Sequence, residues 1–259
     1  MRKSKTLAEK SLSFFENVGD FSVMSFEIFK ILFSGKIHIR NTLQQLAFIG
    51  TDSLPIVLLT GISIGMVFAL QVTGLFQRYG ATSMVGAAVG LAIVRELAPL
   101  FTGVVIAGRI GAAITAEIGS MKVTEQIDAM TAMAVNPLRY LAVPRVLSCM
   151  IMVPLLTVIA VVVGVSGGML VAVYVKKVLM AQYIESVRDF IIPADIFKCM
   201  LKGAVFGVIV SLISCFKGIN TGEGAQGVGI STTGAVVTSL ISIFIMNYLL
   251  SLVLFASKV

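Results

Sequence analysis

Long uncharged stretches dominate the hydrophobic pattern of the chain. Residues 53–77, 146–175 and 224–257 contain no Asp, Glu, Lys or Arg. A helix needs roughly 20 predominantly apolar residues to cross the hydrocarbon core of a bilayer. Each stretch therefore predicts one membrane span, and we place these spans at residues 54–76, 146–174 and 231–256.

Two further apolar stretches carry charges. Residues 83–108 are interrupted only by an adjacent Arg and Glu, and residues 196–216 hold two Lys residues in their first half. Lys near the end of a membrane helix can extend its ammonium group to the interface. We therefore count both stretches as spans, which makes five in all.

The segment before the first span, within residues 1–50, is amphipathic. Phe26, Phe29 and Phe33 follow the spacing of one helical face, and charged residues lie between them. This pattern predicts an N-terminal helix lying in the headgroup plane of a membrane. The alternative is a soluble amphipathic helix that docks on the rest of the protein.

Lys and Arg gather on one side of this topology. Residues 1–50 contain seven of them, and the loop between the second and third spans adds four more, from Arg109 to Arg145. Cytoplasmic loops are rich in these residues. We therefore expect a cytoplasmic N-terminus and a C-terminus on the outer, periplasmic side, with the loop at 176–195 also outside.

Composition supports a membrane protein. The 259 residues are 57% hydrophobic and 13% charged, with a mean hydropathy of +0.99. Soluble domains carry roughly 25% charged residues, so a soluble domain is excluded, and so is a disordered chain. The single His leaves little for a metal site or a His-dependent triad, and we expect neither a metal nor a catalytic residue.

Arg95 and Glu96 lie near the middle of the second predicted span. A charge at that depth costs about 2.5–3.5 kcal/mol, so such residues seldom lack a partner. Adjacent helical residues point about 100° apart, so the two cannot simply pair with one another. Lys202 is the partner that we predict for Glu96. These charges either clamp the bundle together or line a substrate cavity.

A short amphipathic helix is predicted at residues 120–135. Ser120 can cap its start, and Asn136-Pro137 ends it because a residue before Pro avoids the helical region. The helix is too short to span a membrane. It is either a connector lying on the membrane or a contact for a cytoplasmic partner.

Four segments carry a family resemblance. Arg95-Glu-Leu-Ala-Pro-Leu, Ala107-Gly-Arg-Ile-Gly-Ala-Ala, Ala116-Glu-Ile-Gly-Ser-Met-Lys and Asn136-Pro-Leu-Arg-Tyr-Leu resemble the MlaE permeases of phospholipid ABC transporters. The resemblance implies a homodimer in the bacterial inner membrane. It also implies a cytoplasmic ATPase dimer, a periplasmic lipid-binding protein of the MCE type and often a STAS-domain protein as partners.

The resemblance also assigns residues. It implies that the helix at 120–135 is a coupling helix that docks on the ATPase. Phospholipid would occupy a cavity between two permease copies, lined by spans one, two and five, and Arg95 and Glu96 match the charged pair of the family's second span. We add Lys202, the predicted partner of Glu96, to the charged residues of this cavity. The residues implied at the ATPase-facing end are Glu125, Gln126, Asp128, Lys122, Arg109 and Glu117.

The functional prediction is one membrane permease domain over residues 1–259 that moves phospholipid and so maintains outer-membrane lipid asymmetry. The chain has no G-x-x-x-x-G-K-[ST] motif, so we expect ATP and Mg²⁺ on a separate ATPase and no cofactor here. One alternative is an ion-coupled secondary transporter that uses Arg95, Glu96 and Lys202 as a relay, although the paired repeats of such proteins are missing. A third alternative is a membrane enzyme that acts on lipid. The only His, His38, would be its candidate catalytic residue, but no acid or nucleophile lies beside it in the sequence.

Overall fold

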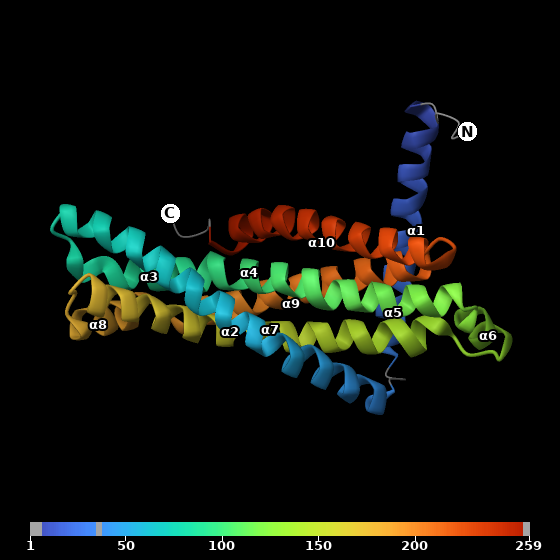
Figure 1. Ribbon diagram of the computed structural model, residues 1–259, viewed down its shortest axis with the longest axis horizontal. Helices are drawn as coiled ribbons and strands as arrows, with labels where there is room; N and C mark the ends of the chain where they lie inside the picture. Colours follow the sequence, from blue (N-terminus) through green and yellow to red (C-terminus); the bar gives the residue numbers. More distant parts are fainter. Residues whose placement is uncertain (1–6, 35–37, 256–259) are drawn as a thin grey trace.

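The computed structural model describes residues 7–34 and 38–255, and within these ranges the regular structure is entirely helical. The helices form one elongated bundle (Figure 1). Their bounds are α1 Leu7–Phe33, α2 Ile39–Arg78, α3 Val85–Ala92, α4 Ala98–Ile106, α5 Ala112–Val123, α6 Gln126–Ala132, α7 Val143–Leu170, α8 Met180–Phe190, α9 Pro193–Ile219 and α10 Gly224–Phe255.

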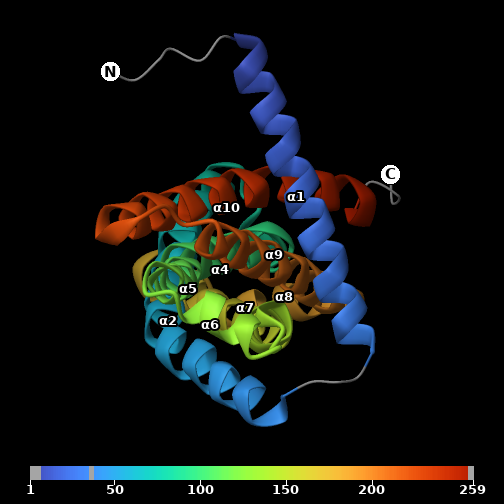
Figure 2. The same cartoon turned by 90° about the vertical axis from the view of Figure 1, so that its right-hand side faces the viewer.

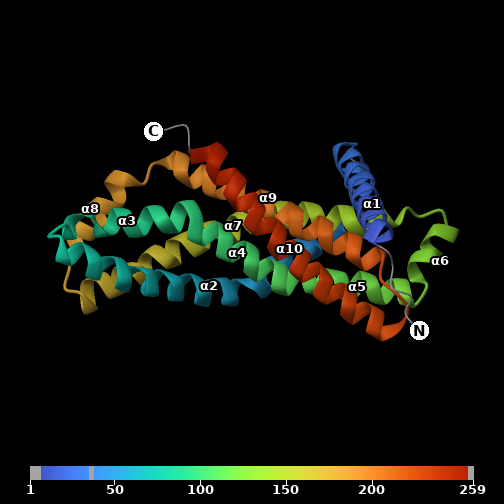
Figure 3. The ribbon, with the colours of Figure 1, turned by 90° about the horizontal axis from the view of Figure 1, so that it is seen from above.

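Five helical stretches in the described ranges are long and apolar enough to cross a membrane, which confirms the predicted number. α6 lies at one end of the bundle, and α8 lies at the other (Figure 1). α10 lies on the outside of the bundle, and α4 runs between it and α2 (Figure 3). The spans are Ile39–Arg78, Thr82–Val123, Leu138–Val175, Pro193–Ile219 and Gly224–Phe255.

The second span is a chain of α3, α4 and α5 joined by two π-helical turns, Ile93–Leu97 and Ala107–Gly111. Pro99 follows the first of these turns. Proline has no backbone N–H and clashes with the carbonyl four residues earlier, so an α-helix cannot continue undisturbed through it. The wider turn accommodates this break without ending the span.

Glycines hold α2 against α7. A Cβ on Gly61 would lie 3.3 Å from the carbonyl oxygen of Ala160, and one on Gly65 would overlap the carbonyl of Gly164. Apolar side chains gain little by leaving lipid for another helix, so close backbone approach at small residues provides the packing. The first and third spans therefore form one closely packed pair.

The N-terminal helix α1 crosses the spans near the α6 end of the bundle (Figure 2). Its Met24 and Ile28 are buried, and Phe21 meets Phe216 of α9 edge to face at 5.5 Å between ring centroids. Phe26 and Phe33 remain exposed. The helix thus docks on the protein by one apolar face, as the second alternative describes, and its position in the headgroup plane of a membrane stays a prediction.

Two connecting segments differ in detail from the prediction. The loop at 176–195 contains the helix α8, whose Tyr183 is buried and donates a hydrogen bond to the carbonyl of Val165 at 3.2 Å. The helix predicted at 120–135 is divided, because α5 runs through Val123 and α6 begins only at Gln126. Ser120 therefore lies inside a helix and caps nothing.

Candidate functional site

The intramembrane charges meet where the second span, α9 and α10 come together. Lys202 is fully buried, and its ammonium lies 2.8 Å from Oε1 of Glu96. The same ammonium donates hydrogen bonds to the backbone carbonyl of Arg95 and to the hydroxyl of Ser251, both at 2.8 Å. The predicted contact between Glu96 and Lys202 is therefore present.

Two side chains of α10 complete the surroundings of Glu96. Asn247 donates its amide to Oε2 at 2.9 Å, and Ser251 donates its hydroxyl to Oε1 at 2.8 Å. Sequence reasoning missed both residues. Their spacing of four in the largely apolar last turns of α10 places them on one face, and this polar pair was the available signal.

Arg95 turns to a different partner. Its guanidinium donates two hydrogen bonds of 3.2 Å to the carboxylate of Asp195, in the first turn of α9. This two-pronged geometry suits Arg because its planar fork matches a carboxylate. Asp195 is buried, although the sequence interpretation placed it in the outer loop.

An aromatic ring at the end of α10 contacts the cations of this cluster. The centroid of Phe255 lies 5.1 Å from Cζ of Arg95, 4.7 Å from Nζ of Lys198 and 5.2 Å from Nζ of Lys202. The face of an aromatic ring attracts cations. Lys198 also donates to the carbonyl of Leu254 at 2.7 Å and so fastens the last turn of α10 to α9.

The charge cluster, defined as Arg95, Glu96, Asp195, Lys198 and Lys202, holds three cations and two carboxylates. One positive charge is therefore in excess. The Arg95 side chain keeps 37% of its surface exposed, whereas those of Lys202 and Asp195 are buried. An anionic group could approach the cluster through Arg95.

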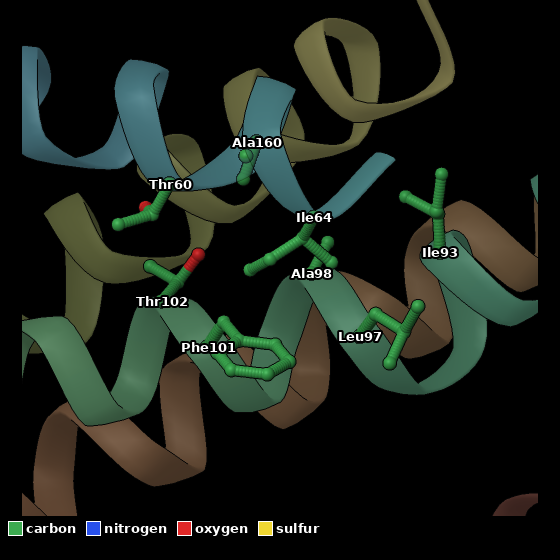
Figure 4. Close-up of a pocket in the computed structure, with 9 residues that line it drawn as sticks. Thr60, Ile64, Ile93, Leu97, Ala98, Phe101, Thr102 and Ala160 are labelled. Carbon is green, nitrogen blue, oxygen red and sulfur yellow. The ribbon is translucent and has the colours of Figure 1, made fainter. Parts of the chain in front are cut away.

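An apolar cleft adjoins the cluster on the side of α2. Figure 4 shows Ile64 of α2 facing Ile93, Leu97 and Phe101 of the second span, with Thr60 and Thr102 as its polar members. Phe101 keeps 38% of its surface exposed. The cleft therefore supplies apolar contacts one to two helical turns from Arg95 and Glu96.

The residues implied at the ATPase-facing end fall into separate groups. Lys122 pairs with Asp128 at 2.9 Å, and both line a shallow cavity of about 230 Å³ together with Glu125 and the 221–224 turn. Gln126 bonds to Thr124 at 3.0 Å.

Arg109 and Glu117 lie apart from this cavity. Arg109 pairs with Asp52 of α2 at 3.5 Å, and Glu117 pairs with Arg145 of α7 at 2.8 Å. Each pair ties the second span to a neighbouring span.

The backbone on both sides of α6 is unusual. Glu125 and Ala134 adopt left-handed conformations with φ of 59°, although neither is glycine. Such a residue costs on the order of 1–3 kcal/mol and is held in place by its surroundings. This short helix is therefore set at a fixed angle to α5, with Ile127 buried and Asp128 pointing outward.

Other chemistry finds little support among the described residues. The ring centroids of His38 and Tyr140 lie 5.6 Å apart. No hydrogen bond or ion pair among the described residues joins His38 to an acid. The three cysteines are buried and unpaired. The described residues contain no group of three or more His, Cys, Asp or Glu that could hold a metal ion.

Comparison with known proteins decides the family. Residues 42–253 match the family described as Permease MlaE. The chain belongs to the MlaE permease family. A protein of Synechocystis named "Probable ABC transporter permease protein" is 45% identical over 229 residues, which are 88% of this chain and 87% of that protein.

Further relatives match most of this chain. A Rickettsia conorii protein with the same descriptive name is 41% identical over 248 residues, 96% of each chain. The Arabidopsis thaliana protein TRIGALACTOSYLDIACYLGLYCEROL 1, chloroplastic, is 42% identical over 220 residues, 85% of this chain and 63% of that protein. The chain is thus a multi-pass membrane permease subunit of the MlaE family.

Proposed function

We propose that the chain is the permease subunit of an ABC transporter that moves phospholipid between the bacterial inner membrane and a periplasmic lipid-binding partner. In this proposal two copies form the path, and the transport maintains the lipid asymmetry of the outer membrane. The supporting observation is the apolar cleft of α2 and α4 beside a charge cluster with one excess positive charge.

A phospholipid is amphipathic, so its site needs a broad apolar surface and few polar contacts. The cleft in Figure 4 holds only about 10 Å³, so it supplies an apolar wall for an acyl chain rather than an enclosed site, and the partly exposed guanidinium of Arg95 offers a contact for a phosphate. α10 also suits a position beside lipid or a second copy. Only 11% of the residues in its most apolar stretch are buried inside the protein, against 67% for α9.

The energy source in this proposal is a separate cytoplasmic ATPase dimer, since the sequence carries no phosphate-binding loop of its own. The set of α6, Lys122, Glu125, Gln126 and Asp128 is the contact for that ATPase. An MCE-type protein would receive or deliver lipid on the opposite side, with a STAS-domain protein as an additional cytoplasmic subunit. The N-terminus would be cytoplasmic and the C-terminus periplasmic.

The test is transport by the purified chain, reconstituted in vesicles with its ATPase and a soluble MCE-type acceptor. We expect a fluorescent phospholipid to exchange between vesicle and acceptor only with hydrolysable ATP. Asp195→Asn, which weakens the hold on Arg95, should slow this exchange, whereas Lys177→Gln at a distant exposed position should not. Exchange driven by a proton gradient without ATP would instead support the secondary transporter, and lipid turnover by the chain alone would support an enzyme.

A further inference from the structure

A second cavity lies between side chains of α1, α9 and α10, far from the charge cluster. Figure 2 shows α1 crossing the other two helices. Its volume is about 380 Å³, within the range of small-molecule sites. Fifteen residues of α9 separate Lys217 in this groove from Lys202, about 22 Å along the helix. The α1 groove is lined by Asn17, Val18, Phe21, Ile213, Phe216, Lys217, Thr238 and Ser242.

The walls of the α1 groove combine one cation with apolar surface. Phe21 and Phe216 meet edge to face and form part of the wall. Lys217 lies in the last turn of α9, and across residues 7–34 and 38–255 no ion pair or hydrogen bond of its ammonium is described. A lone ammonium group beside an apolar cavity favours an anionic ligand with a hydrocarbon part.

The groove continues into a surface that suits lipid. Thr238 and Ser242 share one face of α10 with Ile245 and Leu249, because these positions are separated by four, three and four residues. Ile245 and Leu249 are 59% and 47% exposed. The polar end of the groove therefore leads directly onto an outward apolar strip within the span.

We propose that the α1 groove binds one anionic phospholipid of the leaflet at the α6 end of the bundle. Its phosphate contacts Lys217, and an acyl chain runs past Phe216 toward Ile245. Basic pockets between membrane helices are known binding sites for anionic headgroups. Such a lipid would join α1 to α9 and α10, and the site is independent of whether the protein transports lipid.

The absence of Trp from the chain makes a direct test possible. The full-length Val18→Trp variant places a single fluorophore in the groove, and Ile245→Trp places one on the apolar strip. Each variant is reconstituted in nanodiscs that contain brominated phosphatidylglycerol or brominated phosphatidylcholine, because bromine quenches Trp on contact. Thr238→Trp, on the opposite wall, repeats the measurement if Val18→Trp disturbs α1.

We expect the groove fluorophore to favour phosphatidylglycerol about fivefold, the effect of one lysine near an anionic surface. Adding Lys217→Gln should abolish this preference, whereas Lys30→Gln, which removes an exposed charge from α1, should leave it unchanged. Ile245→Trp should be quenched equally by both lipids. Equal quenching in the groove, a preference that survives Lys217→Gln, or quenching by neither lipid because protein fills the groove would each overturn the proposal.

Discussion

The ammonium of Lys202 donates a hydrogen bond of 2.8 Å to the backbone carbonyl of Arg95. Pro99 stands four residues after Arg95, and because it lacks an N–H it cannot supply the usual α-helical bond to that carbonyl. Lys202 also bonds to Glu96. One buried side chain of α9 thus compensates both a backbone group affected by proline and an intramembrane carboxylate.

Lys202→Met should therefore destabilise the bundle strongly. The substitution leaves Glu96 with only its neutral partners and removes a donor from the Arg95 carbonyl. Removing one partner of a buried ion pair lowers the free energy of unfolding by about 3–5 kcal/mol. We expect a loss near the lower value, because the Glu96 side chain is 40% exposed. Reversible unfolding in mixed micelles, followed by far-ultraviolet circular dichroism, measures the loss.

Two variants show whether charge causes this loss. Adding Glu96→Gln to Lys202→Met removes the unpaired carboxylate, so at least half of the stability should return. Lys198→Met removes a cation that bonds to a carbonyl rather than to a carboxylate, and it should cost roughly 1 kcal/mol. If the double variant lost the full sum of its two single losses, the ion pair would not be the cause.

Glycine substitutions should separate close packing from helix propensity. Gly65→Ala would drive a Cβ into the carbonyl of Gly164, so we expect a loss of about 1–3 kcal/mol as α2 and α7 move apart. Gly61→Ala should cost less, because its Cβ would lie 3.3 Å from the nearest carbonyl. Gly234→Ala has open space and should stabilise α10 by up to about 1 kcal/mol. Equal stabilities of the Gly65 and Gly234 variants would contradict this packing.

Tyr183, in α8 outside the spans, should resist ionisation. Burial raises the pKa of its phenol above the ordinary value of about 10. The folded protein then keeps the proton that the unfolded chain loses, so this stabilising contribution is complete below about pH 10 and declines as the pH rises further.

Comparison with Tyr183→Phe isolates this phenol. The phenolate absorbance of the two proteins should be the same until the alkaline unfolding transition, where the parent gains one additional tyrosinate. A difference that titrates near pH 10 in the folded protein would show that water reaches the phenol.

The number of spans and the partnership of Glu96 with Lys202 could be predicted from sequence, because both rest on the high cost of charge in hydrocarbon. That cost forbids charges in most of a span and demands partners for those that remain. The pairing of Asp195 with Arg95 was not predictable in this way, because a carboxylate at the end of a span can be solvated by water and needs no protein partner. Only the packing of α9 against the second span buries it.

The break in the helix predicted at 120–135 could not be predicted from the sequence for a different reason. The apolar residues Val123, Ile127, Met130 and Ala134 are spaced by four, three and four positions, which fits one continuous helix, and no Gly or Pro lies inside it. The break uses a left-handed Glu125, a conformation that residue type argues against. Tertiary contacts, including the buried Ile127, override the local preference.

The charged surface at α6 yields a prediction that separates binding from folding. The combined change Glu125→Lys and Asp128→Lys should weaken binding of the ATPase at least about tenfold, because opposed charges across an interface discriminate strongly between partners. The fold should survive, since the exposed pair of Lys122 and Asp128 contributes only about 0–1 kcal/mol to stability.

Glu125→Gly is the matched control for the backbone. It keeps the left-handed turn, removes one charge and should raise the free energy of unfolding by about 1 kcal/mol. Copurification with the ATPase and ATP-dependent lipid exchange measure the effect. Exchange at the parent rate in the double variant, with the bundle folded, would remove these two carboxylates from the ATPase contact.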